Sequence, residues 1–191
     1  YRYTAYQYAT FVAVQAIAEK CPPECIEVLS EYKWLLAYHC GNKKVLYLDA
    51  DMRKSTFAER IISPCSIKGL SHYLSSSIAI EDIIYPTQHP SLDVICSGPF
   101  PPNPVELIDS SKFRTLLAAL REVYDYIIID TPPVGSVVDA AIISASSDGV
   151  ILVAASGNLS PKAAREAKAK LERNKDCRII GAILNKVDVN Y

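Results

Sequence analysis

Five short runs of apolar residues, rich in β-branched side chains, stand out along the chain after residue 43. Hydrophobicity within each run is nearly continuous rather than alternating, which is typical of strands covered on both faces, as in a parallel sheet. We therefore predict strands at residues 45–48, 92–96, 126–129, 150–154 and 179–184.

Helical signals lie between these strands. In Asn103-Pro-Val-Glu106, Asn103 is expected to cap a helix, Pro104 to occupy its first position and Glu106 to complete a capping box. A single apolar stripe is expected to follow on the same helix, made of Leu107, Phe113, Leu116, Leu117 and Leu120.

Two more helices are predicted, one opening at Ser160-Pro161 and running to Arg173, the other over residues 137–146. Strands that alternate with helices indicate an α/β fold with a doubly wound, mostly parallel sheet. The length of 191 residues suits a single domain over residues 1–191.

The pattern is less regular over residues 1–42. There we expect a helix at 11–18, the first strand at 25–30 and the last turns of a helix at 34–40. An aromatic cluster at the start of the chain is either a packing face or a partner-binding patch; it consists of Tyr1, Tyr3, Tyr6, Tyr8 and Phe11.

Composition narrows the class of protein. Half of the residues are hydrophobic and the formal net charge is -1, which excludes a disordered chain and predicts no general attraction to nucleic acid. No apolar run approaches the ~20 residues of a membrane span, and no signal peptide is evident. Because the chain begins at Tyr1 rather than Met, we expect it to be a fragment.

Six cysteines are scattered through the chain, as expected of reduced thiols in a cytosol. Four residues of metal-binding types, three cysteines and one histidine, also occur near the N-terminus. These are either ordinary side chains or a zinc site formed by Cys21, Cys25, His39 and Cys40.

Polar residues follow three of the predicted strands. Asp49, Asp51 and Arg53 follow the first, Asp130 ends another, and Asn185 ends the last. Because ligands bind beyond the carboxyl ends of parallel strands, we expect these side chains to meet at one edge. An apolar strand that ends in Asp is the Walker B pattern, in which the acid holds Mg²⁺ beside nucleotide phosphates.

The segment from Asn185 to Asp188 also matches the guanine-reading motif of GTPases. A GTPase would place a glycine three residues after its strand-end acid, whereas Asp130 is followed by Thr-Pro-Pro. Contact with an adenine edge is the favoured role for Asn185, and an ordinary strand-to-loop position is the alternative.

Several segments resemble the bacterial tyrosine kinase (BY-kinase) family, whose members drive capsule and exopolysaccharide synthesis. They are VLYLDADMRKS, GLSHYL, GPFPPNPVELIDSSKF, YDYIIIDTPPVGSVVDA and GAILNKVD. The resemblance covers residues 43–188, while residues 1–42 match poorly. It implies a P-loop NTPase-like, three-layer architecture related to MinD and ParA.

The resemblance also implies an ATP-dependent protein-tyrosine kinase with ATP and Mg²⁺ as cofactors. Asp49, Asp51 and Arg53 would form its catalytic second Walker box, with Asp51 as metal ligand or general base. Asp130 would be the Walker B acid, and Asn185 would touch the adenine. Mg²⁺ would be held by Asp49, Asp51 and Asp130.

Implied partners are a transmembrane polysaccharide co-polymerase, protein tyrosines as substrates, further copies of the chain and no nucleic acid. The implied location is the cytoplasm, at the inner face of the membrane.

The sequence departs from the family in one respect that bears directly on activity. It contains no Gly-x-x-x-x-Gly-Lys-Ser/Thr loop, and only Tyr32, Lys33 and Trp34 stand where that loop is expected. The family's N-terminal Glu/Arg motif is also not intact, and its C-terminal tyrosine cluster is absent unless Tyr191 marks the first residue of a truncated tail.

A diverged pseudoenzyme, an incomplete sequence and a damaged gene would each explain this departure. Impaired ATP binding is expected, and a non-catalytic scaffold or a MinD/ParA-like ATPase are the alternative functions.

Overall fold

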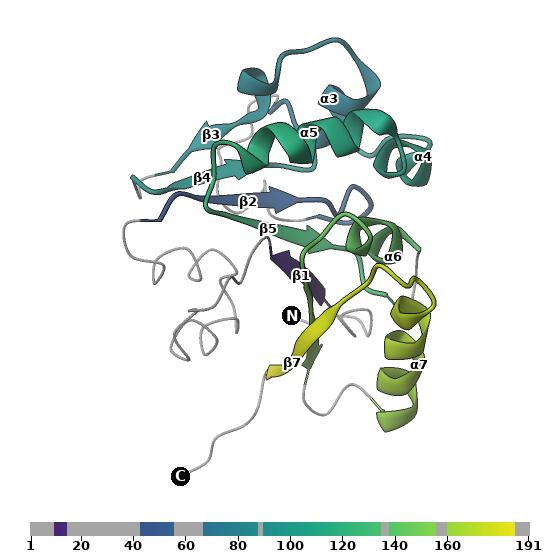
Figure 1. Cartoon of the computed structure of the whole chain (residues 1–191). Coiled ribbons are helices and arrows are strands. Elements are labelled where there is room, and N and C mark those ends of the chain that lie inside the picture. Colours follow the sequence, from purple (N-terminus) through teal and green to yellow (C-terminus); the bar gives the residue numbers. More distant parts are fainter. Residues whose placement is uncertain are drawn as a thin grey trace, which may run out of the picture.

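The computed structural model describes residues 10–14, 43–55, 67–87, 90–134, 138–155 and 160–185. A seven-stranded sheet in the order β3-β4-β2-β5-β1-β6-β7 organises these residues. In Figure 1 this order runs from β3 at the top to β7 at the bottom. The strands are β1 (Thr10–Val14), β2 (Val45–Asp49), β3 (Tyr85–Pro86), β4 (Leu92–Ile95), β5 (Tyr126–Thr131), β6 (Val150–Ala155) and β7 (Ile179–Asn185).

All five strands predicted from apolar runs are confirmed, with ends that shift by at most two residues. β2 pairs in parallel with both β4 and β5, and β6 pairs in parallel with β7. Their carboxyl ends therefore lie at one edge of the sheet, which we call the carboxyl edge. The prediction of a mostly parallel α/β sheet is confirmed.

The central strand β1 runs against its neighbours. It pairs antiparallel with β5 on one side and with β6 on the other. The prediction of a helix at 11–18 is therefore wrong for residues 11–14, which belong to this strand. The strand predicted at 25–30 and the helix at 34–40 lie outside the described residues.

The helices confirm three predicted positions. They are α3 (Leu70–Ser75), the 3₁₀ helix η2 (Ile80–Ile83), α4 (Pro104–Ile108), α5 (Ser111–Arg121), α6 (Asp139–Ser144) and α7 (Pro161–Glu172). The predicted start of α7 at Ser160-Pro161 is confirmed, and Ser160 caps the helix by accepting a hydrogen bond from the Ala163 amide at 3.1 Å. The residues of α3, η2 and β3 were not assigned to any element from the sequence.

The single long helix predicted after Asn103 is wrong in detail. The helix ends at Ile108, and α5 starts anew because the Ser110 hydroxyl accepts a hydrogen bond from the Phe113 amide at 3.1 Å. Asn103 makes no capping bond to the backbone; its amide donates instead to the Glu106 carboxylate at 2.7 Å. A new helix at this point is favoured over continuation of α4, because the Ser110 side chain can cap the first turn of α5.

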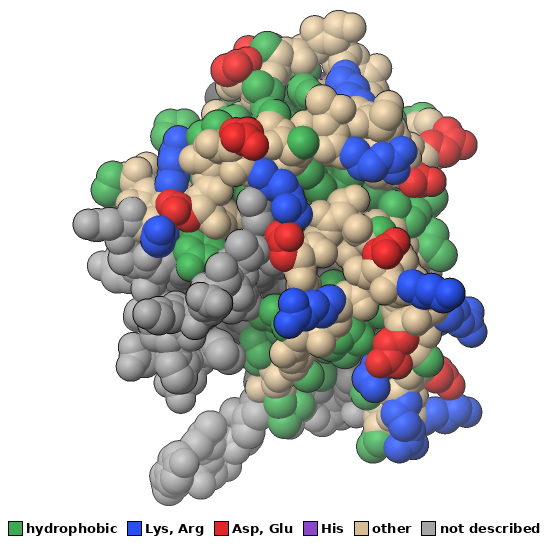
Figure 2. Space-filling view, in the orientation of Figure 1, with side chains coloured by type: hydrophobic (Ala, Val, Ile, Leu, Met, Phe, Trp, Pro, Cys, Tyr) green, Lys and Arg blue, Asp and Glu red, His purple; other side chains and the backbone are tan. Residues whose placement is uncertain are grey.

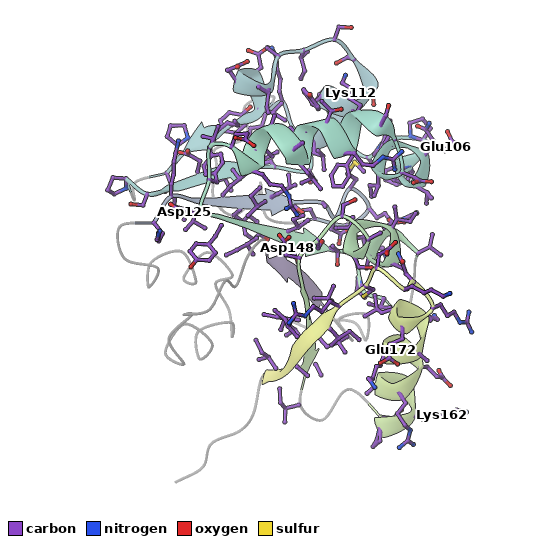
Figure 3. The ribbon with its side chains drawn as sticks, viewed as in Figure 1. Glu106, Lys112, Asp125, Asp148, Lys162 and Glu172 are labelled. Carbon is purple, nitrogen blue, oxygen red and sulfur yellow. The ribbon has the colours of Figure 1, made fainter. Side chains whose placement is uncertain are left out.

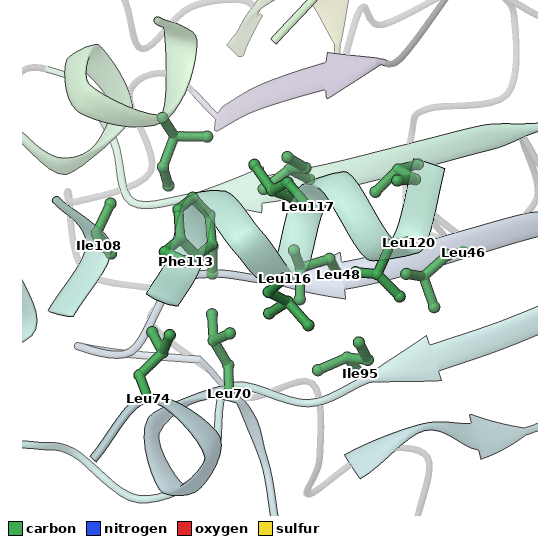
Figure 4. Close-up of a cluster of buried hydrophobic side chains, with 14 of the residues drawn as sticks. Leu46, Leu48, Leu70, Leu74, Ile95, Ile108, Phe113, Leu116, Leu117 and Leu120 are labelled. Atoms are coloured by element: carbon green, nitrogen blue, oxygen red, sulfur yellow. The ribbon is translucent and has the colours of Figure 1, made fainter. Parts of the chain in front are cut away.

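The predicted apolar stripe packs the helices onto one face of the sheet. Phe113, Leu116, Leu117 and Leu120 of α5 are buried in one cluster with Leu46 and Leu48 of β2 and with Ile127 and Ile129 of β5 (Figure 4). A second cluster on the same face joins α6 and α7 to β6. All the longer helices described here therefore cover a single face.

The opposite face of the sheet is also buried. Val45 and Tyr47 of β2 share a cluster there with Leu92 and Val94 of β4, Ile128 of β5 and Val153 of β6. Side chains alternate between faces along a strand, so Asp49 and Asp130 belong to this second face. The candidate chemistry lies on the side of the sheet away from α5.

Two glycines bring α3 against the loop that follows β4. A Cβ at Gly69 would lie 2.3 Å from the backbone nitrogen of Gly98 and 2.5 Å from the carbonyl oxygen of Cys96. Gly98 itself has a φ of 77°, which favours glycine. The amide of Leu70 then donates to the Cys96 carbonyl at 2.8 Å, and that of Ser71 to the Ser97 carbonyl at 2.9 Å.

We expect Gly69→Ala to lower the free energy of unfolding by roughly 2 kcal/mol or more, because its methyl group would collide with backbone atoms. The matched control is Gly181→Ala, since a Cβ there meets no atom within 4 Å; its effect should stay within about 1 kcal/mol. Urea denaturation of both variants measures the difference. Equal stabilities would contradict the close packing of α3 on this loop.

Candidate functional site

Two buried carboxylates lie side by side at the carboxyl edge. Asp49 ends β2, Asp130 lies one residue before the end of β5, and the two residues are direct partners in the parallel register. Their exposed fractions are 0% and 7%. Neighbouring strands lie only about 4.8 Å apart, so two negative charges are held close together with little water to screen them.

Hydrogen bonds hold the Asp49 carboxylate from three directions. The Ser55 hydroxyl donates to one oxygen, and the Asp51 amide donates to the other at 3.1 Å. The Ser97 hydroxyl, in the loop after β4, donates to the same carboxylate. The orientation of the Asp49 carboxylate is thus fixed by the turn after β2 and by the loop after β4.

The pKa of Asp49 is nevertheless raised from 3.8 to about 7. Burial is the largest cause, because it removes water from the charged form, and the negative charge of Asp130 adds to it. The three hydrogen bonds act in the opposite direction without cancelling these effects. A bound cation would lower the free-energy cost of ionising Asp49 next to Asp130.

Asp130 has a partner that was not predicted from the sequence. The hydroxyl of Tyr47, on β2, donates to Asp130 Oδ2 at 2.9 Å. Burial and the charge of Asp130 raise the pKa of Tyr47 well above its usual value, so the phenol keeps its proton. Within an apolar strand, Tyr47 carried no signal of this role.

Asp51 organises the turn that follows β2. Its Oδ1 accepts hydrogen bonds from the amides of Arg53 and Lys54, each at 3.0 Å. Aspartate commonly closes turns in this way by bonding backbone amides two and three residues on. Asp51 remains half-buried at the carboxyl edge, so it is accessible from the solvent side of the site.

Arg53 is tied to a residue that sequence reasoning missed. Its Nε donates to Asp139 Oδ2 at 2.8 Å and its Nη2 to Asp139 Oδ1 at 3.2 Å. Asp139 opens helix α6 and its side chain is only 1% exposed. This two-pronged ion pair joins the turn after β2 to the segment after β5 and engages the guanidinium that we had expected to take part in catalysis.

Asn185 lies at the same edge but farther away. It ends β7, where it pairs with Ala155 of β6. Three strand spacings separate β7 from β5, or about 14 Å, which is too far for direct contact with Asp130. The side chain of Asn185, and Asp188 with it, lie outside the described residues, as does the possible zinc set of Cys21, Cys25, His39 and Cys40.

The donor set fits a hard divalent cation such as magnesium. Among the residues that the structure describes, no three His, Cys, Asp or Glu side chains are arranged to hold a metal. Mg²⁺ usually takes one or two carboxylates and completes its shell with water and phosphate oxygens. The close pair of Asp49 and Asp130 meets that need, with Asp51 next to it.

Comparison with known proteins identifies the family. A family model described as an AAA domain matches residues 35–175. The tyrosine-protein kinase CpsD of Streptococcus agalactiae is 42% identical over 145 residues, which cover 76% of this chain and 63% of that protein. The chain belongs to the bacterial tyrosine kinase family. It spans less than two thirds of the length of this curated relative.

Solved BY-kinase structures support the same assignment. The kinase domain of VpsO is 38% identical, with a TM-score of 0.71 over 77% of this chain and 72% of that one. The kinase domain of the Escherichia coli tyrosine kinase ETK is 34% identical, with a TM-score of 0.70 over 78% of this chain and 59% of that one. None of the helices in the described part of this BY-kinase chain is long and apolar enough to cross a bilayer.

The ion pair of Arg53 should be structural. We expect Arg53→Ala to lower the free energy of unfolding by roughly 3 kcal/mol, because it leaves the buried Asp139 carboxylate uncompensated. Arg121→Ala is the matched control, since Arg121 also grips Asp148 with two nitrogens, at 3.2 and 3.0 Å, but in an exposed position. That variant should lose less than about 1 kcal/mol in urea denaturation.

Figure 3 labels Asp148, which lies just before β6 and so at the opposite edge from the site. Equal losses in the two arginine variants would contradict the structural role of the Arg53–Asp139 pair.

The raised pKa of Asp49 makes stability depend on pH. Between 3.8 and about 7 the folded protein keeps a proton that the unfolded chain has lost. Raising the pH through this window must remove that proton at a cost, so the metal-free protein loses stability as the pH rises. Asp49→Asn should remove this loss, gaining roughly 1 to 4 kcal/mol relative to the wild type between about pH 4 and pH 8.

Denaturation at several pH values measures the effect. Asp125→Asn serves as the control, because hydrogen bonds to the Lys44 amide and the Lys43 ammonium lower the pKa of Asp125. The difference between that variant and the wild type should stay constant above about pH 5. A pH-independent difference for Asp49→Asn as well would show that Asp49 is ionised throughout this range.

Proposed function

We propose that this chain is the phosphoryl-transfer domain of an ATP-dependent protein-tyrosine kinase, and that it retains the metal-binding half of the site. The single observation that carries the proposal is the buried pair of Asp49 and Asp130 at adjacent strand ends. A close pair of carboxylates, in which burial and then the charge of Asp130 raise the pKa of Asp49, is suited to a divalent cation. Membership of a family of tyrosine kinases supplies the reaction class.

The residues of this chain would divide the work as follows. Asp49 and Asp130 would hold Mg²⁺, which offsets the charge on nucleotide phosphates during phosphoryl transfer. Asp51, half-buried at the same edge, would accept the proton of a substrate tyrosine. A free tyrosine hydroxyl has a pKa near ~10, so an aligned carboxylate helps to remove its proton as the phosphate bond forms.

Phosphate binding is where we expect this chain to be weak. The sequence has no glycine-rich Walker A loop, whose backbone amides normally cradle the phosphates. The direction of β1 supports the same inference. β1 runs antiparallel to β5, from Phe11 opposite Thr131 to Val14 opposite Ile128, so its carboxyl end points away from the edge that carries Asp49 and Asp130.

A non-catalytic scaffold is the second candidate, favoured by this same orientation of β1. A scaffold would keep the folded domain as a docking unit without turnover. Under either candidate we propose that the partner is a transmembrane polysaccharide co-polymerase, which would hold the domain at the inner face of the membrane. Acidic and basic side chains are interspersed over the face shown in Figure 2, so that view offers no single-sign patch as an alternative anchor.

We expect this chain to bind Mg-ATP with a dissociation constant no better than about 1 mM, or ~4 kcal/mol of binding free energy. Isothermal titration calorimetry on the chain as it stands measures this value. Asp130→Asn should abolish the magnesium dependence of binding. Asp93→Asn is the matched control, because Asp93 also accepts a hydrogen bond from a tyrosine but lies away from the carboxyl edge of its strand.

Three outcomes separate the candidates. Weak, magnesium-dependent binding with transfer of radiolabelled phosphate to a tyrosine peptide supports the kinase. Absence of any magnesium-dependent binding at millimolar ATP supports the scaffold. A micromolar dissociation constant would mean that the chain binds the phosphates of ATP in another way. The prediction of weak Mg-ATP binding would then be wrong.

A further inference from the structure

Tyr47 stands out among the buried side chains because it joins the two carboxylates from inside the sheet. It lies two residues before Asp49 on β2, so both side chains point to the same face. In the parallel register its direct partner is Ile128, and Asp130 is two residues farther along β5. The long phenol reaches this diagonal neighbour, as aromatic side chains can.

Burial makes this contact more than a surface hydrogen bond. Tyr47 is 1% exposed and Asp130 is 7% exposed, so little water can replace the hydroxyl. The bond of 2.9 Å commits Oδ2 of Asp130 to Tyr47. Because that oxygen is fixed, rotation of the carboxylate is restricted and the direction of its other oxygen is set.

We propose that Tyr47 is a positioning residue that holds the Asp130 carboxylate in the orientation needed to bind a divalent cation. This inference rests on the proposed function, since it takes Asp130 as a magnesium ligand. Partners that orient a metal ligand through a hydrogen bond commonly change metal affinity 10- to 100-fold when they are removed. In this hydrogen bond the Tyr47 hydroxyl is the donor and Asp130 Oδ2 the acceptor.

The chain contains a matched pair that separates positioning from stability. Tyr124, which follows α5, also donates its hydroxyl to a carboxylate, Asp93 on β4, at 2.7 Å. Tyr124 is buried as well, with 4% exposure. Its position, just before Asp125 and the start of β5, is at the amino edge of the sheet, away from Asp49 and Asp130. Removing either hydroxyl leaves a carboxylate short of one donor, but only one of these carboxylates belongs to the site.

The test compares Tyr47→Phe with Tyr124→Phe in the full chain. Mn²⁺ serves as the probe, because its binding can be followed by electron paramagnetic resonance without nucleotide and without any assay of activity. We expect Tyr47→Phe to weaken Mn²⁺ binding by about 10-fold or more, and Tyr124→Phe to change it by less than about 2-fold. Both variants should lower the midpoint of urea denaturation by similar amounts, since each loses one buried hydrogen bond.

The outcomes also distinguish this inference from the proposed function. If the wild type binds Mn²⁺ and Tyr47→Phe binds it equally well, the positioning role is wrong while the metal site stands. Equal weakening in both tyrosine variants would assign the effect to stability and overturn the inference. If the wild type fails to bind Mn²⁺ at millimolar concentration, both the metal site and this inference fail.

Discussion

Mutual repulsion between Asp49 and Asp130 is the constraint on which the site depends. The parallel register places the two carboxylates next to each other, and burial removes the water that would screen them. A folded protein tolerates such a pair only if donors or a cation compensate the charge. The donors around the pair, from Ser55, Ser97 and the Asp51 amide on Asp49 and from Tyr47 on Asp130, meet part of this need.

These donors come from elements that the rest of the fold holds in place. Ser97 depends on the close contact between Gly69 and Gly98, which seats α3 on the loop after β4. The turn that carries Ser55 is anchored through Arg53 to Asp139 at the start of α6. Packing of α5 and α6 on one face therefore positions side chains on the opposite face. The helical layer serves the site without contributing a ligand to it.

The direction of the central strand β1 bears on how the site can bind nucleotide phosphates. Nucleotide phosphates carry several charges, and a metal held by two carboxylates neutralises only part of them. Backbone amides at a helix N-terminus can bind the rest of the phosphate charge where that helix follows a strand at the carboxyl edge. The strand between β5 and β6 is β1, whose carboxyl end points to the opposite edge. Family membership establishes the ancestry, while phosphate binding has to be measured on this chain.

The sequence by itself determined the parallel strands and the acids at their ends. Continuous apolar runs such as residues 126–129 can only be covered on both faces, and strand direction then brings Asp49 and Asp130 to one edge. It also determined the start of α7, because a Ser-Pro pair acts within a single turn. These features follow from local chemistry and from one general rule of parallel sheets.

Only the tertiary structure decided the partners of those acids. Tyr47 was indistinguishable from a core residue, and Asp139 from a helix-opening acid, because each bonds to a residue more than eighty positions away in the sequence. The strand at Thr10–Val14 was likewise missed. A segment of five mostly apolar residues can be helix or strand, and here its place between β5 and β6 decides that it is a strand. Local patterns specify which segments are strands and helices, but a side-chain contact across the sheet depends on which strands become neighbours, and local patterns do not specify that.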